Sequence, residues 1–355
     1  MGLLYEKAIR PILFKADAED AHERAIKSLK FLCHFKFLLK LMERYNCVVS
    51  ERPIELFGLN FPNPVGLAAG FDKNAECWPA MSALGFGFVE IGTVTAKEQP
   101  GNQRPRLFRL LQHEALINRM GFNNEGVEKV AQRLAAQFNN YKRSRIPLGI
   151  NIGKSKVTTL DHAAQDYLTS FKALADYADY FAINVSSPNT PGLRKLQGKD
   201  HLEALLTVLS EANHQRAVKL GKQRLPMLLK IAPDMSFQQV DTIVETLMSV
   251  GLDGVIATNT MVERPGAMGE ITESGGLSGQ PIASRAINIV NYIHRSTNGK
   301  LPVIGVGGIV NERAAGAFFD AGASLVQLYS GMVYRGPFWA REVARAVSWR
   351  QREWV

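Results

Sequence analysis

The stretch YFAINVSSPNTPG at residues 180–192 passes from a short apolar run into a polar loop. Its first four residues have the length and composition of a buried strand. Two prolines and a glycine then hold the chain in a non-helical path, with the side chains of Asn184, Ser187 and Asn189 close together. Such a loop either caps a strand with an Asx or Ser turn or offers donors and acceptors to a polar ligand. The stretch by itself leaves both interpretations open.

The same pattern, an apolar run that ends in small or polar residues, recurs along most of the chain. Helices are predicted between most of these runs, for example over 75–84, 161–178, 238–250 and 311–321, and a hairpin-like segment over 54–62 precedes them. Repeated β–α units with continuous apolar strands predict a (β/α)8 TIM barrel of the α/β class. A doubly wound open sheet lacks support, because no GxGxxG follows the first strand. The eight predicted strands are 65–69, 88–93, 148–152, 181–185, 227–231, 254–258, 303–306 and 325–329.

Composition excludes several classes of protein. The chain has 355 residues, of which 46% are apolar and 21% charged, as expected for a globular domain with an appendage. Its net charge of +9 permits nucleic acid, anionic lipid or a carboxylate substrate as partner without choosing among them. Three cysteines without CxxC spacing predict neither a disulfide framework nor a zinc site, which fits a reducing compartment. Neither a cleaved signal peptide nor a spanning helix is expected, since charge appears early and no run of about 18 apolar residues exists.

Residues 1–50 differ from the rest of the chain in residue composition and pattern. No glycine or proline occurs from residue 16 to residue 45, and acidic residues precede basic ones, in the order that a helix dipole favours. A wide apolar stripe interleaved with lysines fits either a helix lying in a membrane interface or a helix pair packed on the main domain. Composition shifts at 51–53, so we predict an N-terminal helical extension, 1–50, and a barrel domain, 51–355.

Polar residues follow the predicted strands, at the barrel end where such folds place their chemistry. Lys230 is the most informative of them, because alternation along its strand points it into the barrel if Leu229 faces the helices. A lysine in that position needs an anionic partner, since an unpaired buried charge is very costly. The alternative is that Lys230 lies just above the barrel in solvent.

Glycines near the last strands predict a phosphate site. Gly276-Leu277-Ser278-Gly279, Gly307-Gly308 and Tyr329-Ser330-Gly331 together have the composition of the phosphate cradle that barrels build after strands seven and eight. A phosphate-bearing cofactor with a cation beside its ring system indicates FMN. Lys230 would then stabilise negative charge on the reduced flavin.

Nine motifs carry a resemblance to a known family. AAGFDKN at 68–74, NRMGFNN at 118–124, NIGKS at 151–155, NVSSPNTPGLR at 184–194, KIAPD at 230–234, TNT at 258–260, GGLSGQP at 275–281, GVGGI at 305–309 and SLVQLYSG at 324–331 resemble class 2 dihydroorotate dehydrogenase, in order, from about residue 50 to the end. The resemblance implies an FMN-containing barrel, with one FMN per chain, that oxidises dihydroorotate to orotate in pyrimidine biosynthesis and passes electrons to a membrane quinone.

The resemblance also assigns site residues. By it, the cofactor contacts are Ala69, Gly70, Phe71, Asp72, Lys73, Thr93, Asn151, Asn184, Lys230, Thr258, Gly279, Gly308, Tyr329 and Ser330. The substrate contacts are Lys73, Asn118, Arg119, Met120, Gly121, Phe122, Asn184, Asn189, Asn259 and Thr260. Several amides and a cation suit a flat, anionic ring that bears an imide.

Ser187 matches the catalytic base of the family, which removes the C5 proton of the substrate while the C6 hydride moves to flavin N5. A free serine is a poor base, so a relay through Thr190 or a water is needed. The soluble class carries cysteine here and lacks the extension, so serine and residues 1–50 both indicate the quinone-linked class. That class implies a monomer attached through 1–50 to the cytoplasmic face of the inner membrane as a peripheral protein.

Two competing functions are disfavoured. Another FMN barrel, such as a tRNA dihydrouridine synthase, would use a catalytic cysteine, and only Cys77 falls near a barrel loop. A non-catalytic nucleic-acid-binding protein would concentrate its basic residues in a patch with interleaved aromatics, whereas here they are spread along helices. No nucleic-acid partner is therefore expected.

Overall fold

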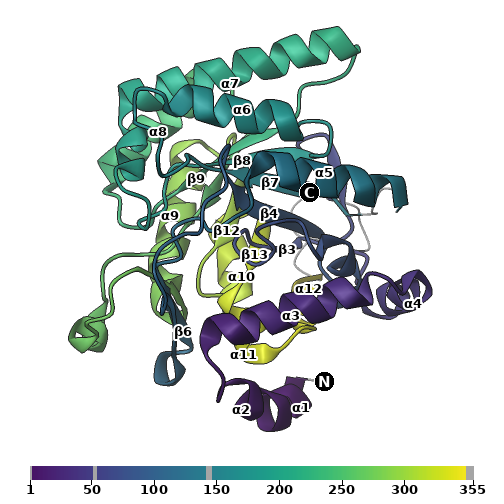
Figure 1. Ribbon diagram of the computed structural model, residues 1–355. Helices are drawn as coiled ribbons and strands as arrows, with labels where there is room; N and C mark the ends of the chain where they lie inside the picture. The colour runs from purple at the N-terminus through teal and green to yellow at the C-terminus, as the bar shows by residue number, and fades with distance from the viewer. Residues whose placement is uncertain (1, 51–53, 141–145, 349–355) are drawn as a thin grey trace.

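Eight parallel strands close into a barrel in the computed structural model, which describes residues 2–50, 54–140 and 146–348 (Figure 1). Each predicted strand is present, and the bounds agree to within two residues. The (β/α)8 fold predicted from the sequence is thus confirmed. In chain order the barrel strands are β3 (Val65–Leu67), β4 (Phe88–Val94), β7 (Leu148–Ile152), β8 (Tyr180–Asn184), β9 (Met227–Ile231), β10 (Gly254–Ala257), β12 (Val303–Val306) and β13 (Leu325–Leu328).

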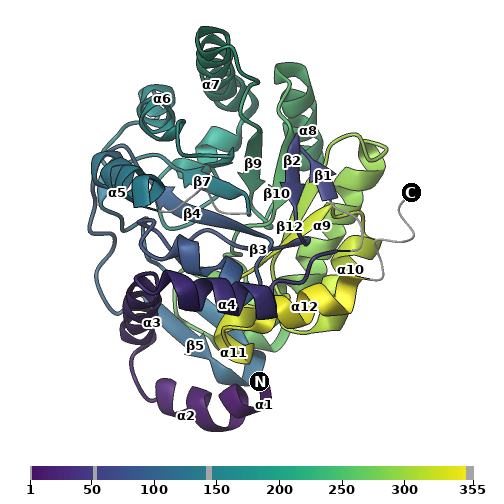
Figure 2. The same cartoon turned by 90° about the vertical axis from the view of Figure 1, so that its right-hand side faces the viewer.

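Helices surround the barrel, as both views show (Figures 1 and 2). The predicted helix over 75–84 is wrong: two short 3₁₀ turns, Trp78–Ala80 and Ser82–Leu84, stand there instead. Asp72 ties up the preceding loop by accepting hydrogen bonds from the backbone N–H groups of Glu76 (2.7 Å) and Cys77 (2.8 Å), so a regular helix does not start at residue 75. The helices are α5 (Gly126–Asn140), α6 (Ala163–Leu174), α7 (Lys199–Leu220), α8 (Phe237–Val250), α9 (Ala283–Ser296), α10 (Glu312–Asp320), α11 (Ser330–Arg335) and α12 (Trp339–Val347).

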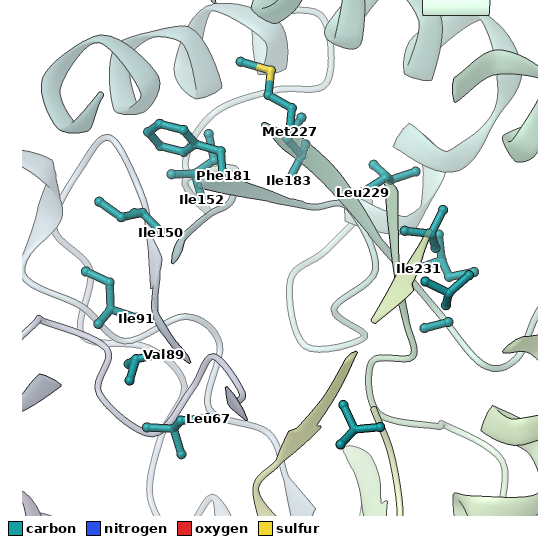
Figure 3. Packing of buried hydrophobic residues seen from close by; sticks show 14 of the residues in the cluster. Leu67, Val89, Ile91, Ile150, Ile152, Phe181, Ile183, Met227, Leu229 and Ile231 are labelled. Atoms are coloured by element: carbon teal, nitrogen blue, oxygen red, sulfur yellow. The ribbon is translucent and has the colours of Figure 1, made fainter. Parts of the chain in front are cut away.

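The main core lies between the strands and the helices. Alternate strand residues such as Ile183, Leu229 and Ile231 point outward into it (Figure 3). The intervening residues point into the barrel, where Phe88, Leu228 and others form a second cluster at the amino-terminal end. The predicted hairpin, β1 (Ile54–Leu56) with β2 (Leu59–Phe61), packs against that second cluster. One end of the barrel is therefore filled with apolar side chains, and the polar chemistry is left to the other end.

A three-stranded antiparallel sheet outside the barrel was missed by the sequence reading. It consists of β5 (Leu107–Leu110), β6 (Ala115–Asn118) and β11 (Gly276–Gly279). The segment 276–279, interpreted above as a glycine loop, is therefore a strand, and it lies between the sixth and seventh barrel strands in the sequence. Its register places Gly276 opposite Asn118 and Gly279 opposite Ala115, so it brings 115–118 to the rim of the barrel.

The N-terminal segment forms helices α1 (Gly2–Leu4), α2 (Arg10–Leu13), α3 (Ala18–Leu32) and α4 (Lys36–Asn46), with a π-helical turn over Tyr5–Ile9. They lie together on one side of the barrel (Figures 1 and 2). Asp17 caps α3 by accepting from the backbone N–H groups of Glu19 and Asp20. In the described part of the chain, no helix is long and apolar enough to cross a bilayer. The predicted domain boundary at 51–53 lies outside the described residues.

Candidate active site

A large cavity opens at the carboxyl-terminal end of the barrel. It holds about 1100 Å³ of space free of protein atoms, counting its open mouth, which is enough for a cofactor and a small substrate. Side chains from most of the strand ends and from the outer sheet meet here because parallel strands in a barrel all end on the same side. The predicted residues that line it are Ala69, Gly70, Lys73, Thr93, Asn118, Met120, Gly121, Phe122, Asn184, Ser187, Asn189, Lys230, Thr258, Asn259, Thr260, Gly279, Gly308, Tyr329 and Ser330.

Four predicted contact residues do not line this cavity. Asp72 is buried and caps the adjacent loop, and Phe71 packs edge-on against the ring of His22 from α3. Arg119 points to the outer surface, where its guanidinium pairs with Glu273 at 2.6 Å. Asn151 lies beneath the cavity floor, fully buried. The sequence could not distinguish these from their neighbours, because motif membership says nothing about which way a side chain turns.

An amide network forms the floor. Thr93 donates to the side-chain oxygen of Asn151 at 2.6 Å, and the Asn184 amide donates to Thr93 at 3.0 Å. Asn259 in turn donates to Asn184 at 3.2 Å and to the hydroxyl of Ser186 at 2.9 Å. Strands β4, β7, β8 and β10 are thereby linked through their ends, which fixes the amides in one orientation.

Glu90 is the functional candidate that the sequence reading missed. It lies on β4, is fully buried inside the barrel, and its carboxylate is 3.7 Å from the ammonium of Lys230. Lys230 faces inward and is 5% exposed, as its strand alternation predicted. The predicted anionic partner of the lysine thus exists within the chain. A detectable signal was present, because Glu90 is an acid within the apolar strand residues 88–94.

The loop after β8 carries Ser187, which is 6% exposed at the cavity wall. Its Oγ accepts a hydrogen bond from the backbone N–H of Asn189 at 3.3 Å, and the Asn189 amide donates to the carbonyl of Asn118 at 2.9 Å. Near them, the hydroxyl of Thr190 is buried and has no hydrogen-bond partner among the residues that the structure describes. Arg194 closes the loop by donating to the carbonyl of Ser186 at 3.1 Å.

Two ionisable groups at the cavity have shifted pKa values. Burial is the main cause that lowers the pKa of Lys73 to about 8, while the carboxylate of Glu19 acts in the opposite direction. The Lys73 ammonium donates to the carbonyl of Gly70 at 2.8 Å. Burial likewise raises the pKa of Tyr329 to about 12, so its hydroxyl stays protonated at neutral pH. The charge of Lys73 therefore changes within an experimentally accessible pH range.

Glycines make one wall a bare backbone surface. Gly308 has a φ of +78°, and a Cβ atom there would lie 2.6 Å from the Cβ of Ala283. Gly279 has a φ of +99°, and a Cβ atom would lie 2.3 Å from the carbonyl oxygen of Glu114. Neither position accepts a side chain without movement of its neighbours. Both glycines line the cavity, beside the hydroxyls of Ser278 and Ser330, which lie 2.9 Å apart.

A second cavity separates the barrel mouth from the N-terminal helices. It is bordered on one side by Glu19, His22 and Ile26 of α3, and it shares Lys73 and Met120 with the main cavity. Burial, reinforced by the charge of Lys73, lowers the pKa of His22 to about 3, so this imidazole is neutral. The extension therefore borders a space that adjoins the main site.

Buried ion pairing attaches the extension to the barrel. The Arg106 guanidinium binds both carboxylate oxygens of Glu19 through its Nε, at 3.1 and 3.0 Å, and reaches Oε1 again through Nη2 at 2.8 Å. Glu19 is 3% exposed and Arg106 is 8% exposed. Breaking such a buried pair from one side costs about 3 to 5 kcal/mol. The helix α3 is consequently held in place at the edge of the second cavity.

Comparison with known proteins agrees with the geometry. The family model for dihydroorotate dehydrogenase matches residues 53–349. The chain is 50% identical to a dihydroorotate dehydrogenase (quinone) of Salinispora arenicola over 97% of its length and 99% of the relative. It is 47% identical to that of Vibrio parahaemolyticus, over 97% and 99% of the two chains. A crystal structure of DHODH from Eimeria tenella in complex with ferulenol superposes with a TM-score of 0.78 at 38% identity, covering 89% of this chain and 90% of the other. The chain therefore belongs to the dihydroorotate dehydrogenase family, among relatives of the quinone type.

Proposed function

We propose that the main cavity holds one FMN per chain together with the substrate, and that the second cavity leads to the quinone. The overall reaction follows from the family: the enzyme oxidises dihydroorotate to orotate in pyrimidine biosynthesis, with a quinone as acceptor. The observation that carries the placement is a single cavity in which a glycine-lined wall, an inward-facing lysine and a buried serine meet. A bound flavin supplies the two-electron acceptor that links the two substrates.

The residues present fit FMN. The backbone at Gly279 and Gly308, with the hydroxyls of Ser278 and Ser330, would hold the phosphate through neutral donors. Lys230 would face the ring system. The side-chain oxygen of Gln327 is buried at the cavity and has no hydrogen-bond partner in the described structure. It could therefore accept a hydrogen bond from an N–H group such as that of the flavin imide.

The substrate would be held by the opposite wall. The carboxylate of the substrate needs a cation. Lys73 is the candidate, because its side chain lines the cavity and its pKa of about 8 leaves the ammonium mostly protonated at neutral pH. Its ring amide and imide groups need both donors and acceptors, which the side chains of Asn118, Asn189 and Asn259 offer. Phe122 adds an apolar surface at the same wall.

Ser187 is proposed to remove the proton from C5 of dihydroorotate. Its Oγ lines the cavity, and within the described part of the chain it accepts a single long hydrogen bond, from the backbone N–H of Asn189 at 3.3 Å, so a lone pair remains for the proton. The unpartnered hydroxyl of Thr190, three residues along the same loop, is proposed to continue the proton path to solvent, directly or through a water. Arg194 holds the loop so that this geometry persists.

Residues 1–50 are proposed to place the enzyme on the membrane surface. Large apolar side chains remain exposed on these helices even though α3 and α4 are docked, and lysines surround them. An apolar face with cationic edges suits the headgroup region of a bilayer, where a long-tailed quinone is found. We place this surface on the cytoplasmic side of the cell membrane, in a monomeric enzyme. The exposed apolar residues are Leu3, Leu4, Ile9, Ile12, Leu13, Phe31, Phe35, Phe37, Leu38, Leu41, Tyr45 and Val49.

The visible spectrum of the purified protein and its quinone reductase activity test the proposal. We expect a yellow protein that releases one equivalent of FMN on denaturation, that is bleached by dihydroorotate without oxygen, and that recovers its colour on addition of quinone. A colourless protein that nonetheless turns over dihydroorotate would contradict the assignment of the cavity. Release of FAD instead of FMN would contradict the cofactor.

A further inference from the structure

A buried acid lies inside the barrel beneath the proposed flavin site. Glu90 is fully buried, and three donors converge on it. The Asn151 amide donates to Oε1 at 2.8 Å, the Gln327 amide donates to Oε2 at 2.8 Å, and the Tyr180 hydroxyl donates to Oε2 at 3.3 Å. A carboxylate accepts hydrogen bonds and does not donate them, so all three donors are matched to its oxygens.

The contact between Glu90 and Lys230 is a charge pair without a shared hydrogen bond. The Lys230 Nζ lies 3.7 Å from the nearer carboxylate oxygen, which is too long for a hydrogen bond. No protein hydrogen bond to this ammonium is found among the described residues, and Lys230 lines the cavity. Glu90 therefore offsets the charge of the lysine while its own acceptors are occupied by other residues. The N–H groups of Lys230 remain free for a ligand.

We propose that Glu90 is a positioning residue that sets the electrostatic potential at the flavin ring by offsetting the charge of Lys230. This inference rests on the proposed FMN site. Lys230 alone would place a full positive charge in a low-dielectric barrel, which would strongly favour an anionic reduced ring. With Glu90 beneath Lys230, the pair is close to neutral overall. The flavin ring then experiences the field of a dipole, which falls off quickly with distance and whose positive end faces the cavity. The reduced state is then stabilised enough for the oxidised flavin to accept two electrons from the substrate, but not so strongly that electron transfer from the reduced flavin to the quinone is impeded.

The single variant Glu90→Gln tests the direction of the effect. Loss of the negative charge leaves Lys230 uncompensated, so the equilibrium constant for flavin reduction should rise by about tenfold or more, or roughly 30 mV for a two-electron couple. Glutamine has nearly the same shape as glutamate, and its side-chain oxygen can still accept the hydrogen bond from the Asn151 amide. Glu98→Gln removes an exposed acid that pairs with Lys129 at 2.6 Å, and it should leave the flavin potential unchanged.

The double variant Glu90→Gln/Lys230→Met removes both charges together and so avoids an unpaired buried ion. We expect Lys230→Met alone to lower the flavin potential and the double variant to return it close to the wild-type value. The potentials are measured by spectroelectrochemical titration of the holoenzymes, with FMN added where a variant has lost it. If the double variant keeps the low potential of Lys230→Met, Glu90 does not offset the lysine and the inference is overturned. Absence of flavin from the wild-type protein would instead overturn the proposed function.

Discussion

Lys73 should make substrate affinity depend on pH. Its folded-state pKa is lowered, mainly by burial, to about 8, so the ammonium loses its proton as the pH rises through that value. Only the ammonium can pair with the carboxylate of orotate. The protonated fraction of a group with a pKa of about 8 falls from roughly nine-tenths at pH 7 to roughly one-tenth at pH 9. Orotate affinity should therefore fall about tenfold between these two pH values.

Equilibrium binding of orotate is the suitable assay, because product binding does not require the proton transfer assigned to Ser187. Isothermal titration calorimetry of the holoenzyme at pH 7, 8 and 9 would measure the affinity directly. Lys73→Met should bind orotate weakly at every pH. Lys73→Arg is the matched control, since a guanidinium stays charged over the whole range and should flatten the pH dependence.

Two results would refute this reasoning. A wild-type affinity that stays constant from pH 7 to pH 9 would show that the charge of Lys73 does not control binding. A Lys73→Met enzyme with the same slope as the wild type would assign the pH dependence to another group. The same pKa shift affects stability. Between pH values of about 8 and 10.5, the unfolded chain binds the proton that the folded protein has lost, so the contribution of Lys73 to the free energy of unfolding becomes more favourable as the pH rises.

Three further predictions concern other parts of the molecule. Ser187→Ala should retain flavin and orotate binding while slowing flavin reduction by roughly 100-fold to 10,000-fold in stopped-flow absorbance, and near wild-type speed would remove Ser187 from the mechanism. Gly308→Ala forces a Cβ atom to within 2.6 Å of Ala283 at a φ of +78°, so cofactor release and a lower melting temperature are expected, and full occupancy would argue against a tight glycine wall. Phe37→Glu on the exposed face of α4 should weaken sedimentation with anionic vesicles, whereas Val218→Glu on α7, also exposed, should not; equal effects of the two would argue against the extension as the membrane surface.

The barrel itself was readable from the sequence because its signal is local. Each strand is a short apolar run followed by small or polar residues. Eight such runs separated by helical segments are typical of a closed (β/α)8 barrel. The inward direction of Lys230 followed from alternation once Leu229 was taken to face the helices, since consecutive strand residues face opposite sides. The family resemblance supplied the roles of residues such as Ser187, and the structure places most of the assigned residues around one cavity.

Contacts between distant segments were not readable. The outer sheet pairs 276–279 with 115–118, and glycine-rich strands give little β signal on their own. Arg106 and Glu19 are 87 positions apart, and the sequence around either residue does not indicate which residue it pairs with. The apolar stripe of the extension left two interpretations open. In the structure one face of its helices is docked on the barrel and another is exposed, and a membrane-facing role for the exposed face stays a proposal.

Sequence by itself determined the barrel strands, most of the helices around them and the faces that these elements bury, because hydrophobic periodicity and turn residues act over a few positions of the chain. Only the tertiary structure decided which charges meet. Glu90 is one acid among apolar neighbours in the strand sequence, and it becomes the counter-charge of Lys230 because barrel closure turns β4 and β9 toward the same interior. Electrostatic pairing depends on distance through space, and a sequence separation of 140 positions gives no information about that distance until the barrel is closed.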